Sequence, residues 1–355
     1  MFHGVVMLKS RTVKDEMNGR ERVTAAIKFT GPDRIPHQHC FLPATLKQYP
    51  ELIKLLREYP SDFDGEDYSE DKEYIYIDSF KTGKWTDEWD CEWTVIIPGI
   101  MGQVTGHPLE ELDKLGRYRW PRAADKDFSW IGKREGKRCD KYMMLDGGMT
   151  LFERMIDLRG FENTMLDIAE REPAFYEMRD QIVNYNMGII DRLLEYNPDG
   201  IYLSDDWGSQ ISLMISPESW RELFLPCYKK MFSRVRQAGK HVFFHTDGYT
   251  IEILPDLVDA GANAFWVDLT VNPLNLLKEK LGGKVCFQGL TDVQFTMRWG
   301  TPADVEKHGK DLIKSLGDFN GGFIACSEAD PDQPWENIKT IYETFYKYGT
   351  YPINI

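Results

Sequence analysis

The chain of 355 residues is poor in the signals that mark membrane, secreted and disulfide-bonded proteins. It has no run of about 18 apolar residues, so no membrane span is expected, and the apolar stretch at residues 5–8 is shorter than the hydrophobic region of a secretory signal. Its six cysteines are scattered and form no CxxC pair. In a chain of this length, scattered cysteines favour reduced thiols and a cytoplasmic location.

Motifs for nucleotide-dependent chemistry and for common hydrolases are also missing. The sequence contains no GxGxxG, no Walker loop, no GxSxG and no HExxH. Acidic residues outnumber basic ones by 57 to 43, which gives a net charge of −14. Nucleic acid and anionic membrane surfaces are therefore unfavourable partners.

What the sequence does contain is a regular alternation of strand-like and helix-like segments from about residue 141. Short segments of β-branched and aromatic residues are followed by polar turns and then by stretches with helical periodicity. The expected strands are 35–41, 142–145, 200–203, 241–245, 264–267, 285–287 and 321–325, and the expected helices include 173–196, 217–238, 254–260, 273–281, 302–316 and 334–348. Such alternation predicts a parallel sheet, and about eight strands over this length favour a closed (β/α)8 TIM barrel.

The same pattern predicts the domain organisation. No linker rich in Pro, Gly or Ser interrupts the chain, so residues 17–355 are expected to form a single α/β barrel domain. Residues 1–16 lack a convincing pattern and are expected to be a leader or a disordered extension. The first 130 or so residues are expected to elaborate the mouth of the barrel, and residues 84–98, which are rich in Trp, read as a β-hairpin.

Polar side chains stand at the carboxyl ends of the expected strands, where barrels build their active sites. They are Asp146, Asp205, Asp206, His245, Asp247, Asp268, Gln288, Cys326 and Glu328. His245 and Asp247 are two residues apart, so on an extended strand they share one face. With Cys326 they supply nitrogen, oxygen and sulfur donors, three ligands with a fourth position free, as in catalytic zinc sites. The alternative is that His245 and Asp247 only hydrogen-bond to neighbours and that Cys326 is a buried thiol.

The adjacent acids Asp205 and Asp206 are a second candidate feature. Successive residues of an extended chain point to opposite faces, so only one of these carboxylates is expected to point into the mouth. That carboxylate could bind a cation, act as a general base or hold a polar substrate group. The competing interpretation is that an Asp here caps the amino terminus of a helix.

Several segments together resemble the uroporphyrinogen decarboxylase superfamily. They are MNGRERVTAAI at 17–27, GPDRIP at 31–36, LFER at 151–154, RGF at 159–161, DDWGSQ at 205–210, HTDG at 245–248 and PDQPWENI at 331–338. The resemblance covers about residues 17 to 350 and implies a (β/α)8 fold. The superfamily includes tetrapyrrole decarboxylases and zinc-dependent methyltransferases that move methyl groups between corrinoid proteins and thiols.

The resemblance favours the methyltransferase branch. True decarboxylases carry an Arg-rich segment that pairs with substrate carboxylates, whereas the matching residues here, 36–41, read PHQHCF and contain no Arg. The methyltransferases carry H-x-C where this chain has His245 and Asp247, and a late Cys that Cys326 matches. The resemblance thus implies a His245, Asp247 and Cys326 zinc site, harder than a site with two thiolates.

The function expected from these features is a zinc-dependent methyltransferase that moves a methyl group between a separate corrinoid protein and a small-molecule heteroatom. Asp205 or Asp206 is expected to be catalytic by orienting the substrate. The expected substrate-binding residues are Asp146, Trp207, Gln210, Asp268, Gln288 and Glu328. Two alternatives stay open: a metal-free decarboxylase or lyase for a tetrapyrrole or other acidic substrate, and a non-catalytic barrel that binds a corrinoid or another ligand.

Overall fold

The computed structural model describes residues 17–66, 78–132, 136–289 and 291–355. Residues 1–16, for which a leader or extension was expected, therefore lie outside the described residues. The strands are β1 His37–Phe41, β2 Gly83–Thr86, β3 Glu92–Val95, β4 Gln103–Gly106, β5 Met144–Asp146, β6 Gly200–Ser204, β7 His241–Thr246, β8 Ala264–Val267, β9 Cys286–Gln288 and β10 Phe323–Ala329.

The described helices alternate with the strands of the second half of the chain. They are α1 Gly19–Lys28, α2 Pro43–Gln48, α3 Leu52–Glu58, α4 Phe152–Arg159, α5 Phe161–Glu170, α6 Pro173–Leu194, α7 Pro217–Leu223, α8 Leu225–Gln237, α9 Leu254–Ala260, α10 Leu274–Leu281, α11 Thr296–Trp299, α12 Pro302–Leu316 and α13 Trp335–Tyr348. Short 3-10 turns lie at Asp78–Phe80, Leu112–Arg117, Ala123–Asp125 and Gly136–Asp140. Among the described helices, none is both long and apolar enough to cross a membrane.

Seven parallel strands form one curled sheet in the order β1-β10-β9-β8-β7-β6-β5. Between the two outer strands, the Asp62 amide donates to the His37 carbonyl (2.8 Å), and the Asp62 carbonyl accepts from the Tyr142 amide (2.9 Å). Phe63 adds a single parallel bridge to Tyr142. Among the described residues, the parallel sheet therefore contains seven strands, and a single bridge stands where the predicted (β/α)8 barrel requires an eighth strand. The Asp62 carboxylate accepts from Arg34 (2.9 Å) and from the His37 amide (2.8 Å), which anchors this short segment beside β1.

The alternation of side chains along β7 divides the core into two parts. Val242 and Phe244 point outward into the large cluster that packs the helices against the sheet, whereas Phe243 belongs to the small cluster inside the sheet. His241 and His245 share the parity of Phe243, so all three lie on the inner face of one strand. Helix α1 contributes Val23, Ala26 and Ile27 to the inner cluster and closes the end where the strands begin.

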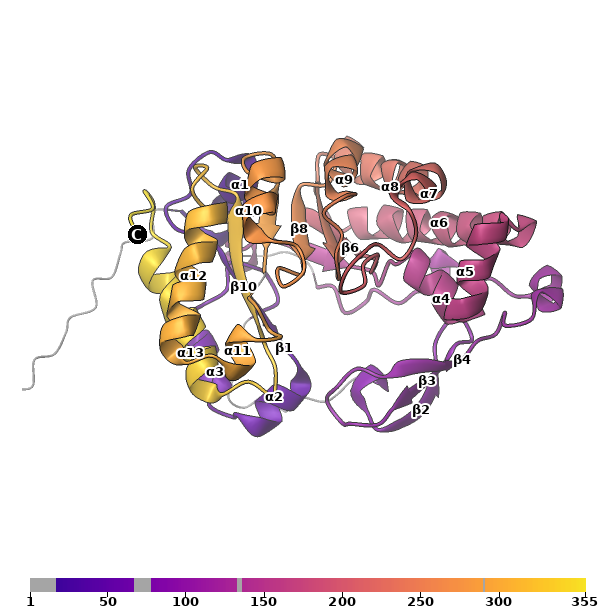
Figure 1. The fold of residues 1–355 in the computed structure, drawn as a ribbon, viewed down its shortest axis with the longest axis horizontal. Coiled ribbons are helices and arrows are strands. Elements are labelled where there is room, and N and C mark those ends of the chain that lie inside the picture. Colours follow the sequence, from indigo (N-terminus) through magenta and orange to yellow (C-terminus); the bar gives the residue numbers. More distant parts are fainter. Residues whose placement is uncertain (1–16, 67–77, 133–135, 290) are drawn as a thin grey trace, which may run out of the picture.

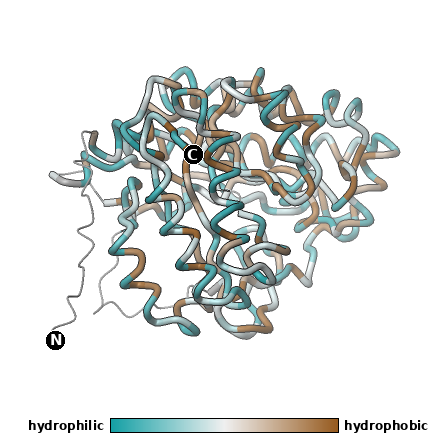
Figure 2. The backbone as a smooth tube through the Cα atoms, turned by 60° about the vertical axis from the view of Figure 1, so that its left-hand side comes forward, coloured by the Kyte–Doolittle hydropathy of each residue, from teal (hydrophilic) through white to brown (hydrophobic). Residues whose placement is uncertain are grey.

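The helices around the sheet are amphipathic, and Figure 2 shows hydrophilic and hydrophobic stretches alternating along the chain. The sequence predicted one helix over 217–238, but the structure contains two, α7 and α8, which meet at Phe224. Pro226 explains the break, because its ring lacks an amide hydrogen and collides with the preceding turn of a continuous helix. Pro226 is instead accommodated in the first turn of α8.

The Trp-rich segment forms the predicted β-hairpin, β2 and β3, and β4 completes a small antiparallel sheet that lies apart from the parallel sheet (Figure 1). Trp85 and Trp93 pair across the hairpin and stack with ring centroids 5.5 Å apart. Asp87, in the turn of this hairpin, accepts an ion-paired hydrogen bond from Arg154 of α4 at 2.7 Å. The small sheet is thereby attached to the helix that follows β5.

Candidate metal centre

Three side chains from the ends of β6 and β7 converge at the carboxyl-terminal mouth of the sheet. Ligand atoms of Asp206, His245 and Asp247 all lie within 4.8 Å of one another. The Nε2 atom of His245 is 3.6 Å from an Asp206 carboxylate oxygen and 3.5 Å from one of Asp247. Each of these distances is longer than a good hydrogen bond, so the imidazole sits between two carboxylates without bonding tightly to either.

Close contact between the two loops fixes this geometry. The Asp205 amide donates to the His245 carbonyl (3.0 Å), and the Asp247 amide donates to the Asp206 carboxylate (2.9 Å). Gly208 and Gly248 cross at a separation that admits no side chain, since a Cβ on Gly248 would come within 2.1 Å of the Gly208 carbonyl oxygen. Gly248 also has φ +76°, which favours glycine. These contacts hold Asp206 and Asp247 on either side of His245.

The electrostatic environment of His245 differs from that of an ordinary surface histidine. Burial alone would lower its pKa, but the close contact and charge of Asp247, with the charges of Asp206 and Glu153, raise the pKa to about 9. Burial raises the pKa of the Asp206 carboxyl. For Asp247 burial acts in the same direction, yet the imidazole outweighs it and lowers the pKa. The group thus concentrates negative charge around one imidazole, which is the field a divalent cation requires.

The residues fit a divalent metal by two further criteria. Donor atoms bound to a tetrahedral zinc at ~2.0–2.2 Å lie ~3.3–3.6 Å apart, close to the separations around His245 Nε2. One imidazole and two carboxylates are harder donors than thiolates, so the set suits Zn²⁺ but also admits Mn²⁺ or Fe²⁺.

Asp205 and Asp206 take opposite roles, as expected for adjacent residues of an extended chain. The Asp205 side chain is fully buried. Its carboxylate accepts the amides at the start of α4, from Leu151 (2.8 Å), Phe152 (3.0 Å) and Glu153 (2.9 Å), and the hydroxyl of Tyr228 (2.6 Å). Asp205 therefore supports a helix amino terminus, and Asp206 is the acid that faces the mouth.

Cys326 lies on β10, outside the group of three ligands. Its partner in the register with β1 is Gln38, and the Cys40 thiol of β1 is close enough to affect its titration. Interaction with the Cys40 thiol and burial raise the Cys326 pKa well above its usual range. The geometry therefore joins the predicted ligands His245 and Asp247 to Asp206, and places the predicted ligand Cys326 in a separate thiol pair.

The remaining predicted residues either line the mouth cavity or are exposed, or they are buried among other side chains. Asp268 and Glu328 line a mouth cavity of about 120 Å³ together with Asp247, and Asp146 is exposed at the end of β5. Gln288 is buried and donates to the side chain of Gln38. Trp207 is fully buried and stacks on Phe152, whereas Gln210 is exposed on the loop after β6.

Sequence reasoning did not single out Glu153 or the rings that flank His245. Glu153 is half-buried in the first turn of α4, and burial, with Asp206 and Asp205, raises its pKa to about 9. Tyr202 and Trp266 face His245 from β6 and β8, with ring centroids 6.5 and 5.5 Å away. The signal that could have found Glu153 is its place in the helix that directly follows a strand end rich in glycine.

The chain is similar to known proteins in sequence and in structure. The family model described as Uroporphyrinogen decarboxylase (URO-D) matches residues 134–348. Among solved structures, a methyltransferase from Methanosarcina mazei matches with a TM-score of 0.69 and 16% identity, over 94% of this chain and 99% of that one. A B12-independent methionine synthase from Shewanella sp. W3-18-1 matches with a TM-score of 0.44 and 9% identity, over 83% of each chain. No curated protein matches the sequence.

Proposed function

We propose that this chain, which belongs to the uroporphyrinogen decarboxylase family, is a metal-dependent methyltransferase. It would move a methyl group between a corrinoid carried by a separate partner protein and a heteroatom of a small substrate. The observation that carries this proposal is the placement of Asp206, His245 and Asp247 around one point at the mouth. The similarity in fold to a methyltransferase, over nearly the full length of both chains, supports the same class of reaction.

Asp206, His245 and Asp247 would hold the metal, for which Zn²⁺ is the expected ion. When bound, such an ion is a Lewis acid that increases the reactivity of a coordinated heteroatom. This set replaces the His245, Asp247 and Cys326 set, because Asp206 supplies a donor on the adjacent strand end. The pairing of Cys326 with Cys40 leaves that thiol to other contacts inside the sheet.

The protein's own residues would position the substrate and manage its proton. Trp266 and Asp247 line the mouth cavity with Asp268 and Glu328, so an apolar wall and carboxylates border the same space. Burial, with the charges of Asp330 and Asp247, raises the Glu328 pKa to about 7. A carboxyl group that titrates near neutrality is suited to deliver or accept the proton of a heteroatom that loses or gains a methyl group.

The decarboxylase alternative receives less support from the residues present. Strand β1 carries no Arg or Lys, and the nearby Arg22 and Arg34 are committed to Asp33 and Asp62. A substrate with several carboxylates needs fixed cations to hold it. An excess of carboxylates at the mouth favours instead a cation and a substrate of lower negative charge.

The test is a methyl-transfer assay with the purified protein, free cob(I)alamin and a panel of methylated oxygen, nitrogen and sulfur compounds. The change in absorbance as methylcobalamin forms measures the reaction. We expect turnover by the wild type, loss of at least 100-fold in Asp206→Asn and no change in Asp259→Asn. Asp259 is exposed on α9, so this control makes the same chemical change away from the mouth. Full activity after metal removal, or CO2 release in place of methyl transfer, would contradict the proposal.

A further inference from the structure

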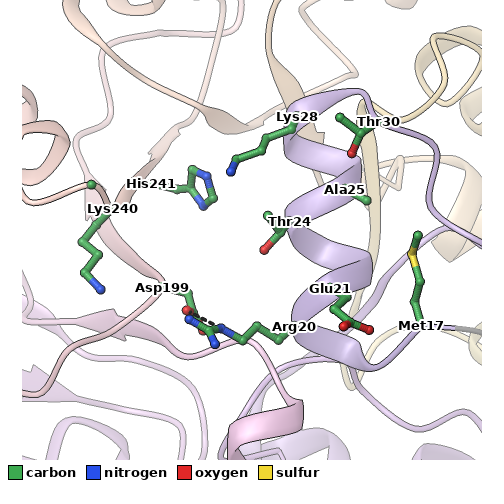
Figure 3. A pocket seen from close by; sticks show the side chains of 11 residues that line it. Met17, Arg20, Glu21, Thr24, Ala25, Lys28, Thr30, Asp199, Lys240 and His241 are labelled. Atoms are coloured by element: carbon green, nitrogen blue, oxygen red, sulfur yellow. Dashed lines mark hydrogen bonds and ion pairs between the residues drawn. The ribbon is translucent and has the colours of Figure 1, made fainter.

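A second cavity, of about 690 Å³, lies at the end of the sheet where the strands begin. It opens between α1 and the segments that lead into β6 and β7 (Figure 3). His241, which starts β7, borders this cavity, whereas His245 lies at the mouth. The two cavities are thus separated by the length of a strand, ~13 Å for four residues. Nothing in the proposed methyltransferase chemistry uses this second cavity.

The charged side chains that line this cavity differ in whether they already have a partner within the protein. Lys28, Lys240 and Arg20 bring three cationic groups to its lining. The carboxylate of Asp199 accepts a hydrogen bond from Arg20 Nε (2.8 Å), and that of Glu21 accepts the Asn18 amide (3.0 Å) in the capping box of α1. Both acids are therefore engaged locally.

Lys28 stands out among these cations. It is exposed in the last turn of α1, and its side chain extends toward the open centre of the cavity in Figure 3. Within the part of the chain that the structure describes, no carboxylate pairs with it. An ammonium group in a concave site without a carboxylate partner attracts an anion from solution.

His241 adds a neutral donor to these cations. The residue is 9% exposed, and its Nδ1 atom lies 2.7 Å from the hydroxyl of Tyr142, which is fully buried. Burial favours the arrangement in which the Tyr142 hydroxyl donates its hydrogen to Nδ1 of His241. That arrangement puts the ring hydrogen on Nε2, the nitrogen on the cavity side. Burial and the charges of Arg236 and Lys28 lower the His241 pKa to about 4, so the ring is neutral at physiological pH.

We propose that this cavity binds a small organic anion through a carboxylate or phosphate group. Lys28 would supply the charge, Arg20 the terminal nitrogens left free by its Nε contact, and His241 and the Thr24 hydroxyl the neutral hydrogen bonds. The volume falls within the ~300–1,000 Å³ typical of metabolite pockets. The apolar lining from Ala25 and Met17 suits the carbon skeleton of such a ligand.

The other nearby occupant would be the chain's own amino-terminal stretch, which precedes Met17. Residues 1–16 contain Lys9, Arg11 and Lys14 against Asp15 and Glu16. A stretch with more basic than acidic side chains does not complement a cationic cavity. Charge complementarity therefore favours a separate anion over this part of the chain.

The test is an NMR titration of the histidine ring signals of the full-length protein with two dianions, inorganic phosphate and succinate. We expect one or both dianions to shift the His241 signals saturably. The dianion that binds more tightly shows whether the cavity prefers a phosphate or a carboxylate group. Lys28→Glu should raise the dissociation constant at least tenfold. Lys314→Glu is the matched control, because Lys314 is also an exposed lysine in the last turn of a helix, α12, and it should leave binding unchanged.

A second variant separates the hydrogen-bonding role from the charge. Thr24→Val keeps the shape of the side chain and removes its hydroxyl, so it should weaken binding several-fold while the ionic-strength dependence of the affinity stays the same. Lys28→Glu should instead flatten that dependence. The inference is overturned if neither dianion shifts the His241 signals, or if Lys28→Glu and Lys314→Glu bind alike.

Discussion

The two ends of β7 carry the same residue in opposite chemical environments. His241 and His245 lie on one inner face, yet burial and cationic neighbours lower the pKa of the first to about 4, whereas carboxylates outweigh burial and raise that of the second to about 9. One end is bordered by Arg20 and Lys28, the other by Asp206 and Asp247. The net charge of −14 gives no sign that cationic and acidic side chains are separated between these two ends. A strand therefore fixes which side chains share a face, and the elements at each end decide their chemistry.

The largest difference between the two ends is expected in metal affinity. His245→Ala removes a proposed ligand, so it should weaken Zn²⁺ binding by more than the ~10–100-fold that loss of a supporting hydrogen bond costs. His241→Ala makes the same change at the other end and should leave the affinity unchanged. Competition with a chromophoric chelator measures both. Equal losses in the two variants would show that metal binding does not distinguish the ends.

The next effect, on protein stability, distinguishes the acid that supports the fold, Asp205, from the acid proposed to bind metal, Asp206. Asp205→Asn places an amide opposite three backbone amides and a tyrosine hydroxyl, and should lower the free energy of unfolding by about 3 kcal/mol, because buried donors lose their acceptor. Asp206→Asn should lower it by less than about 1 kcal/mol, since this side chain is partly exposed. Urea denaturation of the metal-free proteins compares them. The reverse order would place the structural carboxylate at 206.

A pH effect of up to about 3 kcal/mol is expected from His241. Its pKa is about 4 in the folded protein and about 6.5 in the unfolded chain, so the unfolded chain binds more protons between these values. The stabilisation is complete above about pH 6.5 and is lost as the pH falls toward 4. The difference in unfolding free energy between the wild type and His241→Gln should shrink over this window. A difference that stays constant with pH would mean that His241 is not held neutral.

The smallest effect is expected at Cys326. Its thiol pairs with Cys40 and lies outside the Asp206, His245 and Asp247 group, so Cys326→Ser should change Zn²⁺ affinity by less than about threefold. The same chelator competition measures this change. A loss as large as that of His245→Ala would restore the ligand set expected from the sequence and would require β10 to move toward β7 when the metal binds.

The sequence predicted what depends on local pattern. The alternation of strands and helices, the parallel sheet and the shared face of His245 and Asp247 follow from periodicity, and the opposition of Asp205 and Asp206 follows from strand geometry. Closure of the barrel could not be predicted in this way, because it depends on whether residues 61–64 form a ladder with distant strands. The helix break was readable in principle from Pro226, which an amphipathic pattern obscured.

The ligand set and the second cavity could not be predicted from local sequence patterns, because both depend on contacts between distant parts of the chain. Whether Asp206 or Cys326 approaches His245 is decided by strand order, since β6 pairs directly with β7 whereas β10 lies three strands away. The cationic cavity joins α1 to residues more than 170 positions later, as the Arg20 and Asp199 pair shows with a separation of 179. No spacing rule links residues so far apart in the chain.

Anomalous scattering at the zinc absorption edge, from crystals of the wild-type protein grown with Zn²⁺, tests the central claim most directly. We expect one peak per chain, within ~2.0–2.2 Å of His245 nitrogen and of carboxylate oxygens from Asp206 and Asp247. The peak should disappear in Asp206→Asn crystals. A peak bonded to Cys326 without Asp206, or crystals of the zinc-treated wild type with no peak at the mouth, would contradict it.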